Sequence, residues 1–153
     1  MRISFDLDGV IAKSTHWFFR MINILRVLNP DEMTLAEMDY YNICELKYHP
    51  NLFMAKNDTG IIVTARKSMA YEVTEHWLRR HGIDLPIYYA DKDDSIDWAS
   101  YEEGSKQAAI YKAMILRDHR IELHFDNNPI LVNTLRAELP QVKIVLIDNN
   151  LEV

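Results

Sequence analysis

Five short segments rich in β-branched and aromatic residues alternate with stretches of helical periodicity along most of this chain of 153 residues. Segments of this kind are typical of buried strands, and strands separated by helices favour a parallel sheet with both faces covered. The sequence therefore predicts an α/β fold with a central parallel sheet. The expected strands are residues 3–6, 60–64, 87–91, 121–126 and 142–148, and the clearest expected helices are residues 67–81, 105–116 and 129–139.

The chain between the first two expected strands is longer than one helical connection requires. Residues 16–28 form a largely apolar helical pattern, and an Asn-Pro pair follows them. Thr34 and Glu37 have the spacing of a capping box, which predicts that a second helix begins there and runs to about residue 47.

These two helices predict an insertion after the first strand. We expect a small helical cap of residues 13–57 inserted into a core domain of residues 1–12 and 58–153. The apolar surface of the cap must pack on the core, shield a site or meet a second subunit, so a homodimer is one of the possible arrangements.

Composition limits the classes of function. The chain is 48% hydrophobic and 26% charged, as in a soluble globular domain, and its formal charge of −6 argues against a polynucleotide as the main partner. The single cysteine, Cys44, excludes an intramolecular disulfide, and its apolar surroundings predict a buried structural thiol in a reducing, cytoplasmic setting. No stretch is long and uncharged enough to span a membrane, and Asp6 and Asp8 interrupt the N-terminal apolar run, so no signal peptide is expected.

Polar side chains stand where the expected strands end. Asp6, Thr64, Asp91 and Asp126 each close one strand, and the carboxyl ends of parallel strands meet at the same edge of a sheet, where ligands bind. Asp6 and Asp8 lie two residues apart, so in an extended chain both would face one ligand. Thr64 and Asp126 could also serve only as helix N-caps. The stretch that starts at Asp91 is expected to be an exposed acidic loop.

Four motifs in order carry a resemblance to a known family. Asp6-Leu7-Asp8-Gly9-Val10, Ile61-Ile62-Val63-Thr64-Ala65-Arg66, Lys106 and Phe125-Asp126-Asn127-Asn128-Pro129 resemble the haloacid dehalogenase (HAD) superfamily, most of whose members are magnesium-dependent phosphatases. The resemblance covers residues 1–139 apart from the insertion. It implies a Rossmannoid three-layer sandwich around the parallel sheet, with the cap after the first strand.

The resemblance also implies roles for the acids. Asp6 would attack phosphorus and form an aspartyl-phosphate, and Asp8 would protonate the leaving oxygen and then activate water. Mg²⁺ would lie between Asp6, the backbone carbonyl of Asp8 and Asp126, because a hard cation prefers oxygen ligands. Asn127 departs from the pattern, since relatives commonly carry a second acid there, and it would weaken the hold on the metal.

The remaining motif residues would bind the phosphoryl group. The resemblance implies that Thr64 donates hydrogen bonds to it and that Lys106 neutralises its charge. Ala65 and Arg66 would complete the substrate-binding set.

Other classes of site fit less well. An EF-hand loop that started at Asp6 would need Gly and Glu where Ile11 and Trp17 stand, and no Gly-x-Gly-x-x-Gly follows the first strand. A receiver domain would place its acceptor aspartate after a middle strand. The expected function is therefore hydrolysis of a small phosphorylated substrate. A nucleotide is the first expectation, and a sugar phosphate or phosphate binding without turnover are the alternatives.

Overall fold

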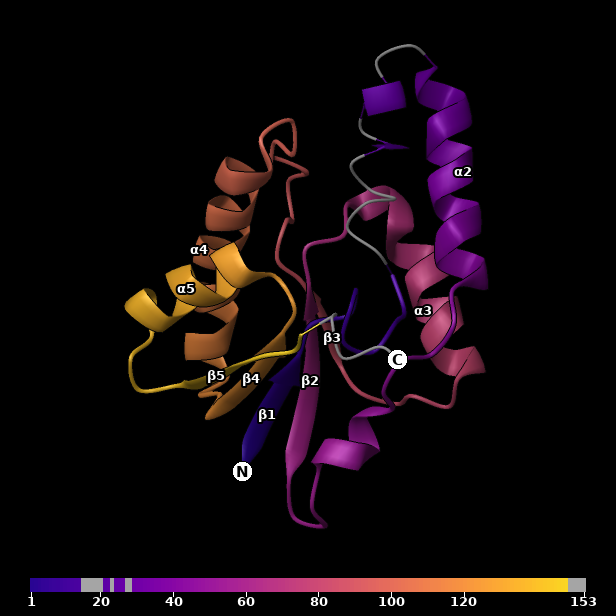
Figure 1. The fold of residues 1–153 in the computed structure, drawn as a ribbon. Helices are drawn as coiled ribbons and strands as arrows, with labels where there is room; N and C mark the ends of the chain where they lie inside the picture. The colour runs from indigo at the N-terminus through magenta and orange to yellow at the C-terminus, as the bar shows by residue number, and fades with distance from the viewer. Residues whose placement is uncertain (15–20, 23, 27–28, 149–153) are drawn as a thin grey trace.

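A five-stranded parallel sheet forms the centre of the computed structural model, which describes residues 1–14, 21–22, 24–26 and 29–148 (Figure 1). The strand order is β3-β2-β1-β4-β5, and every neighbouring pair is parallel, so the predicted α/β sheet is confirmed. The strands are β1 (Arg2–Phe5), β2 (Thr59–Thr64), β3 (Ile87–Tyr89), β4 (Leu123–Asp126) and β5 (Lys143–Leu146).

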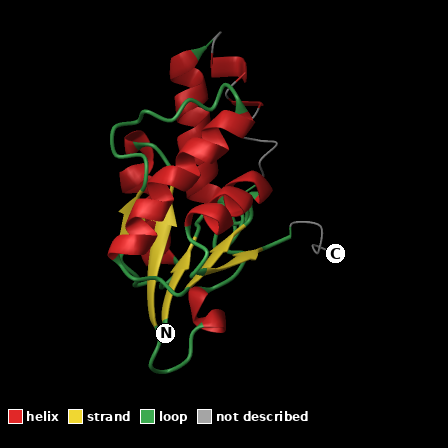
Figure 2. Cartoon of the chain, turned by 90° about the vertical axis from the view of Figure 1, so that its left-hand side faces the viewer, coloured by secondary structure: helices red, strands yellow, loops and turns green. Residues whose placement is uncertain are grey.

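Helices cover both faces of the sheet and complete three layers (Figures 1 and 2). Ile62 and Val63 are neighbours in β2 and point to opposite faces, so each joins a different apolar core. Val63 packs in the core of α4 and α5, and Ile62 packs in the core that contains Trp77 of α3. The helices are α2 (Pro30–Ile43), α3 (Tyr71–Arg80), α4 (Tyr101–Asp118) and α5 (Pro129–Glu138), with 3₁₀ turns η1 (Pro50–Phe53) and η2 (Ser68–Ala70).

The segment between β1 and β2 begins and ends on two adjacent stretches of backbone. Lys13 N–H donates to the carbonyl of Glu45, and Lys47 N–H donates to the carbonyl of Ile11. Most of the helix expected at residues 16–28 lies outside the described residues. Among the helices that the structure describes, none combines the length and apolar character that a membrane span requires.

The start of α2 corrects the capping-box prediction. The helix begins at Pro30, which suits the first turn because its missing N–H needs no partner there. Thr34 therefore lies inside the helix, and its hydroxyl donates to the carbonyl of Pro30 at 2.9 Å. The helix ends at Ile43, and Cys44 follows in extended conformation as a buried thiol, as expected.

Gly9 makes the tight turn after β1. Its φ of +84° lies in the region that favours glycine, and a Cβ there would stand 2.0 Å from Nδ2 of Asn127. The turn is closed by Gly9 N–H donating to the carbonyl of Ala12 at 2.8 Å. The first motif and Asn127 therefore lie in direct contact across the carboxyl ends of β1 and β4.

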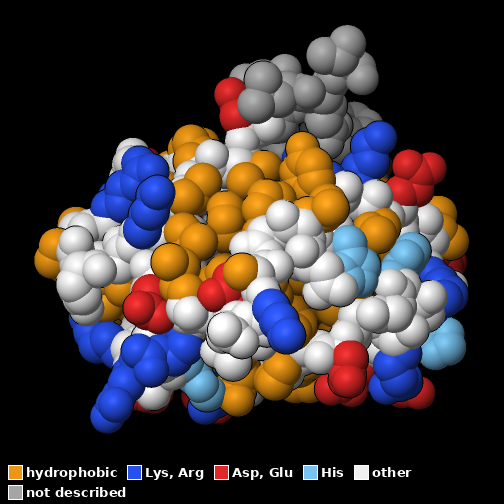
Figure 3. Space-filling view, turned by 90° about the horizontal axis from the view of Figure 1, so that it is seen from below, with side chains coloured by type: hydrophobic (Ala, Val, Ile, Leu, Met, Phe, Trp, Pro, Cys, Tyr) orange, Lys and Arg blue, Asp and Glu red, His pale blue; other side chains and the backbone are white. Residues whose placement is uncertain are grey.

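Charged side chains are scattered over the face seen from below in Figure 3. On its described part, apolar side chains gather in the middle of this face, and most Lys, Arg and acidic side chains lie in separate groups toward its edges.

Candidate functional site

The carboxyl ends of three adjacent strands meet beneath a cavity of about 700 Å³. Asp6 follows β1, Thr64 ends β2 and Asp126 ends β4, and the order β2-β1-β4 places these side chains next to one another. The sequence prediction that these residues share one edge is thus met. The described residues that line the cavity are Asp6, Asp8, Ser14, Ile24, Arg26, Glu37, Tyr41, Thr64, Ala65, Arg66, Lys67, Trp98, Ala99, Tyr101, Lys112, Asp126, Asn127, Asn128 and Leu131.

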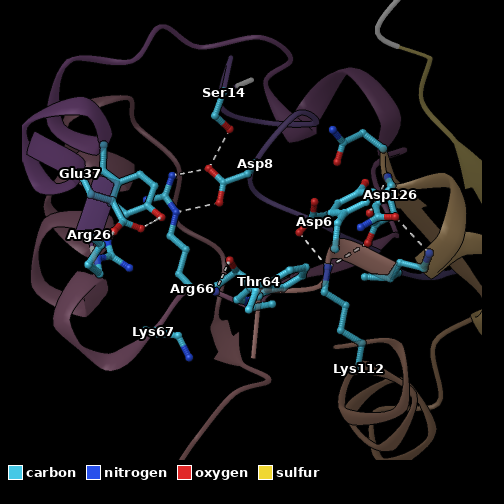
Figure 4. A pocket seen from close by; sticks show the side chains of 18 of the residues that line it. Asp6, Asp8, Ser14, Arg26, Glu37, Thr64, Arg66, Lys67, Lys112 and Asp126 are labelled. Carbon is cyan, nitrogen blue, oxygen red and sulfur yellow. Dashed lines mark hydrogen bonds and ion pairs between the residues drawn. The ribbon is translucent and has the colours of Figure 1, made fainter. Parts of the chain in front are cut away.

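Lys112 of α4 lies between the two strand-end carboxylates (Figure 4). Its Nζ is 2.8 Å from Oδ1 of Asp6 and 2.8 Å from Oδ2 of Asp126. The lysine side chain is 1% exposed and that of Asp126 is also 1% exposed. A buried ammonium group is tolerated here because two carboxylates offset its loss of hydration.

Burial and charge shift the protonation of this group. Burial, together with the charge of Asp126, raises the pKa of Asp6 to about 7, although Lys112 opposes the shift. Burial also opposes ionisation of Asp126, but Lys112 and His124 outweigh it and hold the pKa of Asp126 below its usual value. Burial disfavours the charge on Lys112, and the two carboxylates more than compensate and raise its pKa. Asp126 is therefore ionised beside the Lys112 ammonium, and Asp6 gains or loses its proton near neutral pH.

A buried histidine orients the carboxylate of Asp126. His124 Nε2 lies 3.2 Å from Oδ2 of Asp126, and its Nδ1 lies 2.7 Å from Oγ of Ser4. Burial lowers the pKa of His124, so the neutral ring donates from Nε2 to Asp126 and accepts the Ser4 hydroxyl at Nδ1. Oδ1 of Asp126 accepts from Asn128 N–H at 3.1 Å, so both oxygens of this carboxylate are oriented.

The structure does not bring Lys106 into the site. Its side chain is exposed on α4, with Nζ 3.0 Å from Oε1 of Glu102, so the sequence assignment of Lys106 is corrected to Lys112. The helix begins at Tyr101, four residues earlier than expected, and residue 106 no longer opens it. Lys112 carried a usable signal, because it stands among Ala108, Ala109, Ala113 and Leu116 on the apolar face of the helix.

Asp8 is held by Arg66 in a two-pronged ion pair (Figure 4). Arg66 Nε donates to Oδ2 at 2.9 Å and Nη2 donates to Oδ1 at 2.6 Å, and the Ser14 hydroxyl donates to the same Oδ1 at 2.7 Å. Burial opposes the charge of Arg66, but the Asp8 carboxylate dominates and raises the Arg66 pKa. The sequence predicted that Arg66 contacts a phosphate. In the structure its guanidinium is paired with Asp8, and its Nη1 donates to the hydroxyl of Thr74 at 2.9 Å.

The insertion reaches this ion pair through α2. The guanidinium of Arg66 lies over the ring of Tyr41, with Cζ 3.7 Å from the ring centroid. The Tyr41 hydroxyl donates to Oε1 of Glu37 at 2.8 Å, and Arg26 pairs with Oε2 of the same glutamate. A continuous chain of contacts thus joins the insertion to Asp8.

Thr64 and Ala65 lie where the motif predicts, on the wall of the cavity. The Thr64 side chain is buried, and its hydroxyl oxygen accepts the N–H of Arg66 at 3.2 Å.

Asp91 differs from the exposed loop residue that was expected. It is fully buried, and its carboxylate accepts from the N–H of Ser95 at 2.7 Å and from Lys67 Nζ at 3.1 Å. The Asp91 carboxylate holds the loop after β3 in place. The exposed residues of this loop follow Asp91 in the sequence.

Oxygen donors at the strand ends fit Mg²⁺ better than a softer metal. Within the described ranges, no three His, Cys, Asp or Glu side chains gather as in a closed metal site. Mg²⁺ needs only one or two protein carboxylates, because it keeps several of its waters. Asp6 and Asp126 supply two carboxylates, and Asn127 adds an amide to the same cavity wall.

Arg66→Met is expected to lower the free energy of unfolding by about 3 kcal/mol, because it leaves Asp8 without the partner of a largely buried ion pair. Chemical denaturation measures this loss. Arg79→Met on α3 is the control, since Arg79 is exposed and its loss should change stability by less than about 0.5 kcal/mol. Equal stability of the two variants would show that the Asp8–Arg66 pair contributes nothing.

No protein-family model and no curated protein sequence matches the chain. Among solved structures, the HAD domain of the effector protein Lem4 from Legionella pneumophila aligns over 96% of this chain and 84% of its own, at 11% identity and a TM-score of 0.50. The inactive mutant of that domain aligns over 98% of this chain and 86% of its own, at 11% identity and a TM-score of 0.52. The fold of this chain is HAD-like.

The HAD-like fold also aligns with a chain in the structure of the Pnkp1/Rnl/Hen1 RNA repair complex. That alignment has 18% identity and a TM-score of 0.58, and it covers 96% of this chain. It covers only 42% of the other chain, so this protein spans less than half of that relative's length. At these identities the likeness concerns the fold.

Proposed function

We propose that the protein is a magnesium-dependent phosphatase that hydrolyses a small phosphomonoester through an aspartyl-phosphate on Asp6. The observation that carries the proposal is the group formed by Asp6, Lys112 and Asp126 on the wall of a cavity, with Lys112 2.8 Å from both carboxylates. A carboxylate beside a fixed cation suits attack on an anionic ester, because the cation offsets the charge of the approaching phosphoryl group.

The first step transfers the phosphoryl group to the protein. A carboxylate oxygen of Asp6 forms a bond to phosphorus as the bond from phosphorus to the ester oxygen breaks. Asp8 is an ionised carboxylate paired with Arg66 and Ser14 in this structure, so it must first take up a proton from solvent, and it then gives this proton to the leaving alcohol. Lys112 and the hydroxyl of Thr64 stabilise the charge on the phosphoryl oxygens.

The second step releases phosphate. Water attacks phosphorus, its proton passes to Asp8, and the bond from phosphorus to Asp6 breaks. Release of that proton to solvent returns both carboxyl groups to their starting states, and water is the only further reactant.

Asp6 and Asp126, together with the backbone carbonyl of Asp8, would hold the Mg²⁺ ion. When bound, it supplies positive charge against the phosphoryl oxygens. The position of Asp6 and Asp126 on one cavity wall supports this assignment, because Mg²⁺ takes one or two protein carboxylates and keeps several of its waters. Asn127 carries no charge of its own, so the affinity for the ion is expected to be modest.

Phosphate release from a panel of small phosphomonoesters tests the proposal. Turnover is expected with Mg²⁺, is expected to stop when EDTA removes the metal, and should return when excess Mg²⁺ is added. Turnover that persists in EDTA would contradict the metal requirement. Asn127 favours one second candidate, phosphate binding without turnover, which release from no ester together with measurable binding of inorganic phosphate would support.

A further inference from the structure

Aromatic and apolar side chains line part of the same cavity as the strand-end carboxylates. Trp98 and Tyr101 come from the loop before α4 and its first turn, and Leu131 comes from α5. Figure 1 shows that loop standing above the carboxyl ends of the strands, opposite α2. A substrate with its phosphoryl group at Asp6 would therefore share the cavity with two aromatic side chains.

Trp98 is held in place by a glycine of α4. A Cβ at Gly104 would lie 2.7 Å from Cε3 and 3.0 Å from Cδ2 of the indole, so the ring rests directly on the helix backbone. Glycine inside a helix is destabilising relative to alanine, and the close approach of Trp98 gives Gly104 a structural reason. The indole is only partly exposed and forms a fixed platform at the cavity wall.

The cations that line the cavity each face a carboxylate within the described residues. Lys112 faces Asp6 and Asp126, and Arg66 faces Asp8. Lys67 pairs with Asp91, and Arg26 pairs with Glu37. A second phosphate on the substrate would have to compete with these carboxylates, whereas an uncharged ring would not.

We infer that the cavity selects phosphomonoesters with a single phosphate whose leaving group carries a planar aromatic ring, and that this ring stacks on Trp98. Nucleoside monophosphates and aryl phosphates share this chemistry, and the experiment below separates them. The inference rests on the proposed function for the position of the phosphoryl group, but ligand binding tests it independently of turnover.

The test measures binding of four esters to Asp6→Asn protein with Mg²⁺ by titration calorimetry. The ligands are thymidine 5′-monophosphate, phenyl phosphate, glucose 6-phosphate and thymidine 5′-diphosphate. Because stacking of a base on an aromatic side chain is worth about 1–3 kcal/mol, at least one aromatic monoester is expected to bind about tenfold more tightly than glucose 6-phosphate. The diphosphate is expected to bind no more tightly than the monophosphate. Tight binding of the thymidine ester alone identifies a nucleotide site, and tight binding of phenyl phosphate alone identifies an aryl phosphate site.

Substitutions in the same Asp6→Asn background assign the preference to the ring. Trp98→Ala is expected to remove the tenfold preference, Trp98→Phe to keep most of it, and Met114→Ala on the exposed face of α4 to leave it unchanged. Glucose 6-phosphate binding as tightly as both aromatic esters, or a preference that survives Trp98→Ala, would overturn the inference. If Trp98→Ala fails to fold, the comparison of the four esters and the preference retained by Trp98→Phe still test whether the ring stacks on residue 98.

Turnover by the wild-type protein separates the two proposals. Selective binding without phosphate release from any ester would refute the proposed phosphatase and leave the aromatic site standing. Magnesium-dependent release with equal efficiency from aromatic and sugar esters would refute the aromatic site and leave the phosphatase standing.

Discussion

Lys112→Met is expected to lower phosphate release by about 100- to 1000-fold, the effect of removing one fixed electrostatic contact to a transition state. The same change should lower the free energy of unfolding by about 3–5 kcal/mol, because breaking a buried ion pair leaves uncompensated charge in the interior. Two carboxylates, Asp6 and Asp126, face this ammonium at 2.8 Å, and His124, which also contacts Asp126, is a neutral ring that does not replace the charge. Steady-state kinetics and urea denaturation measure the two losses.

Lys106→Met is the matched control, since Lys106 lies on the same helix and, among the described residues, pairs with exposed Glu102 and Glu103. Its loss should leave both stability and activity unchanged, because exposed pairs of this kind contribute little. The assignment of Lys112 to the site would be refuted if Lys112→Met retained activity while Lys106→Met lost it.

Asp6→Asn is expected to abolish phosphatase activity by about 10⁴-fold or more, as loss of a nucleophile does in other covalent mechanisms. Its effect on stability should be the reverse of the Lys112 effect. Burial and the charge of Asp126 raise the pKa of Asp6 from 3.8 to about 7, so the folded state loses stability as the pH rises from 3.8 to about 7 and carries the full cost of the ionised carboxylate above that pH. A neutral amide removes that cost.

Denaturation at pH 8 in EDTA measures whether Asp6→Asn raises or lowers the free energy of unfolding. Asp6→Asn protein is expected to be at least as stable as wild type there, and the difference should shrink as the pH falls through 7 and Asp6 itself becomes neutral. Asp93→Asn, in the exposed loop after β3, controls for removal of a carboxylate elsewhere. A marked loss of stability in Asp6→Asn at pH 8 would mean that the Lys112 contact outweighs burial.

Hydrophobic periodicity was enough to predict the sheet and three of its helices. The strands contain β-branched and aromatic residues in runs too short for helices, and their parallel order follows from the helices between them. Local signals also placed two helix boundaries correctly. Pro129 begins α5, and Gly82, with a φ of +67°, follows the end of α3.

The prediction was wrong at Thr34 and at Asp91, for different reasons. Thr34 has the local signature of a cap, but Pro30 allows the helix to start one turn earlier. Asp91 has an acidic, polar neighbourhood in sequence, yet Lys67 and the backbone of Ser95 satisfy it in the interior. Ser95 lies only 4 residues after Asp91, but Lys67 lies 24 residues before it, and spacing along the chain does not identify that partner.

The candidate site was predictable in its acids and not in its cations. Asp6, Thr64 and Asp126 follow from strand ends alone, because parallel strands bring their carboxyl ends together. Lys112 depends on the rotation of α4, and a helix start displaced by four residues is enough to select the wrong lysine. Arg66 lies beside Thr64 in sequence, but its pairing with Asp8 depends on the turn that Gly9 makes after β1.

Trapping of the phosphorylated protein tests the central role of Asp6 most directly. Wild-type protein is mixed with a ³²P-labelled ester and Mg²⁺, quenched in acid within milliseconds, and mapped by mass spectrometry after proteolysis. Label on Asp6 that decays as phosphate appears, and that is absent from Asp6→Asn protein, is the result we predict. Rapid turnover with no labelled protein, or label on a residue other than Asp6, would contradict the mechanism.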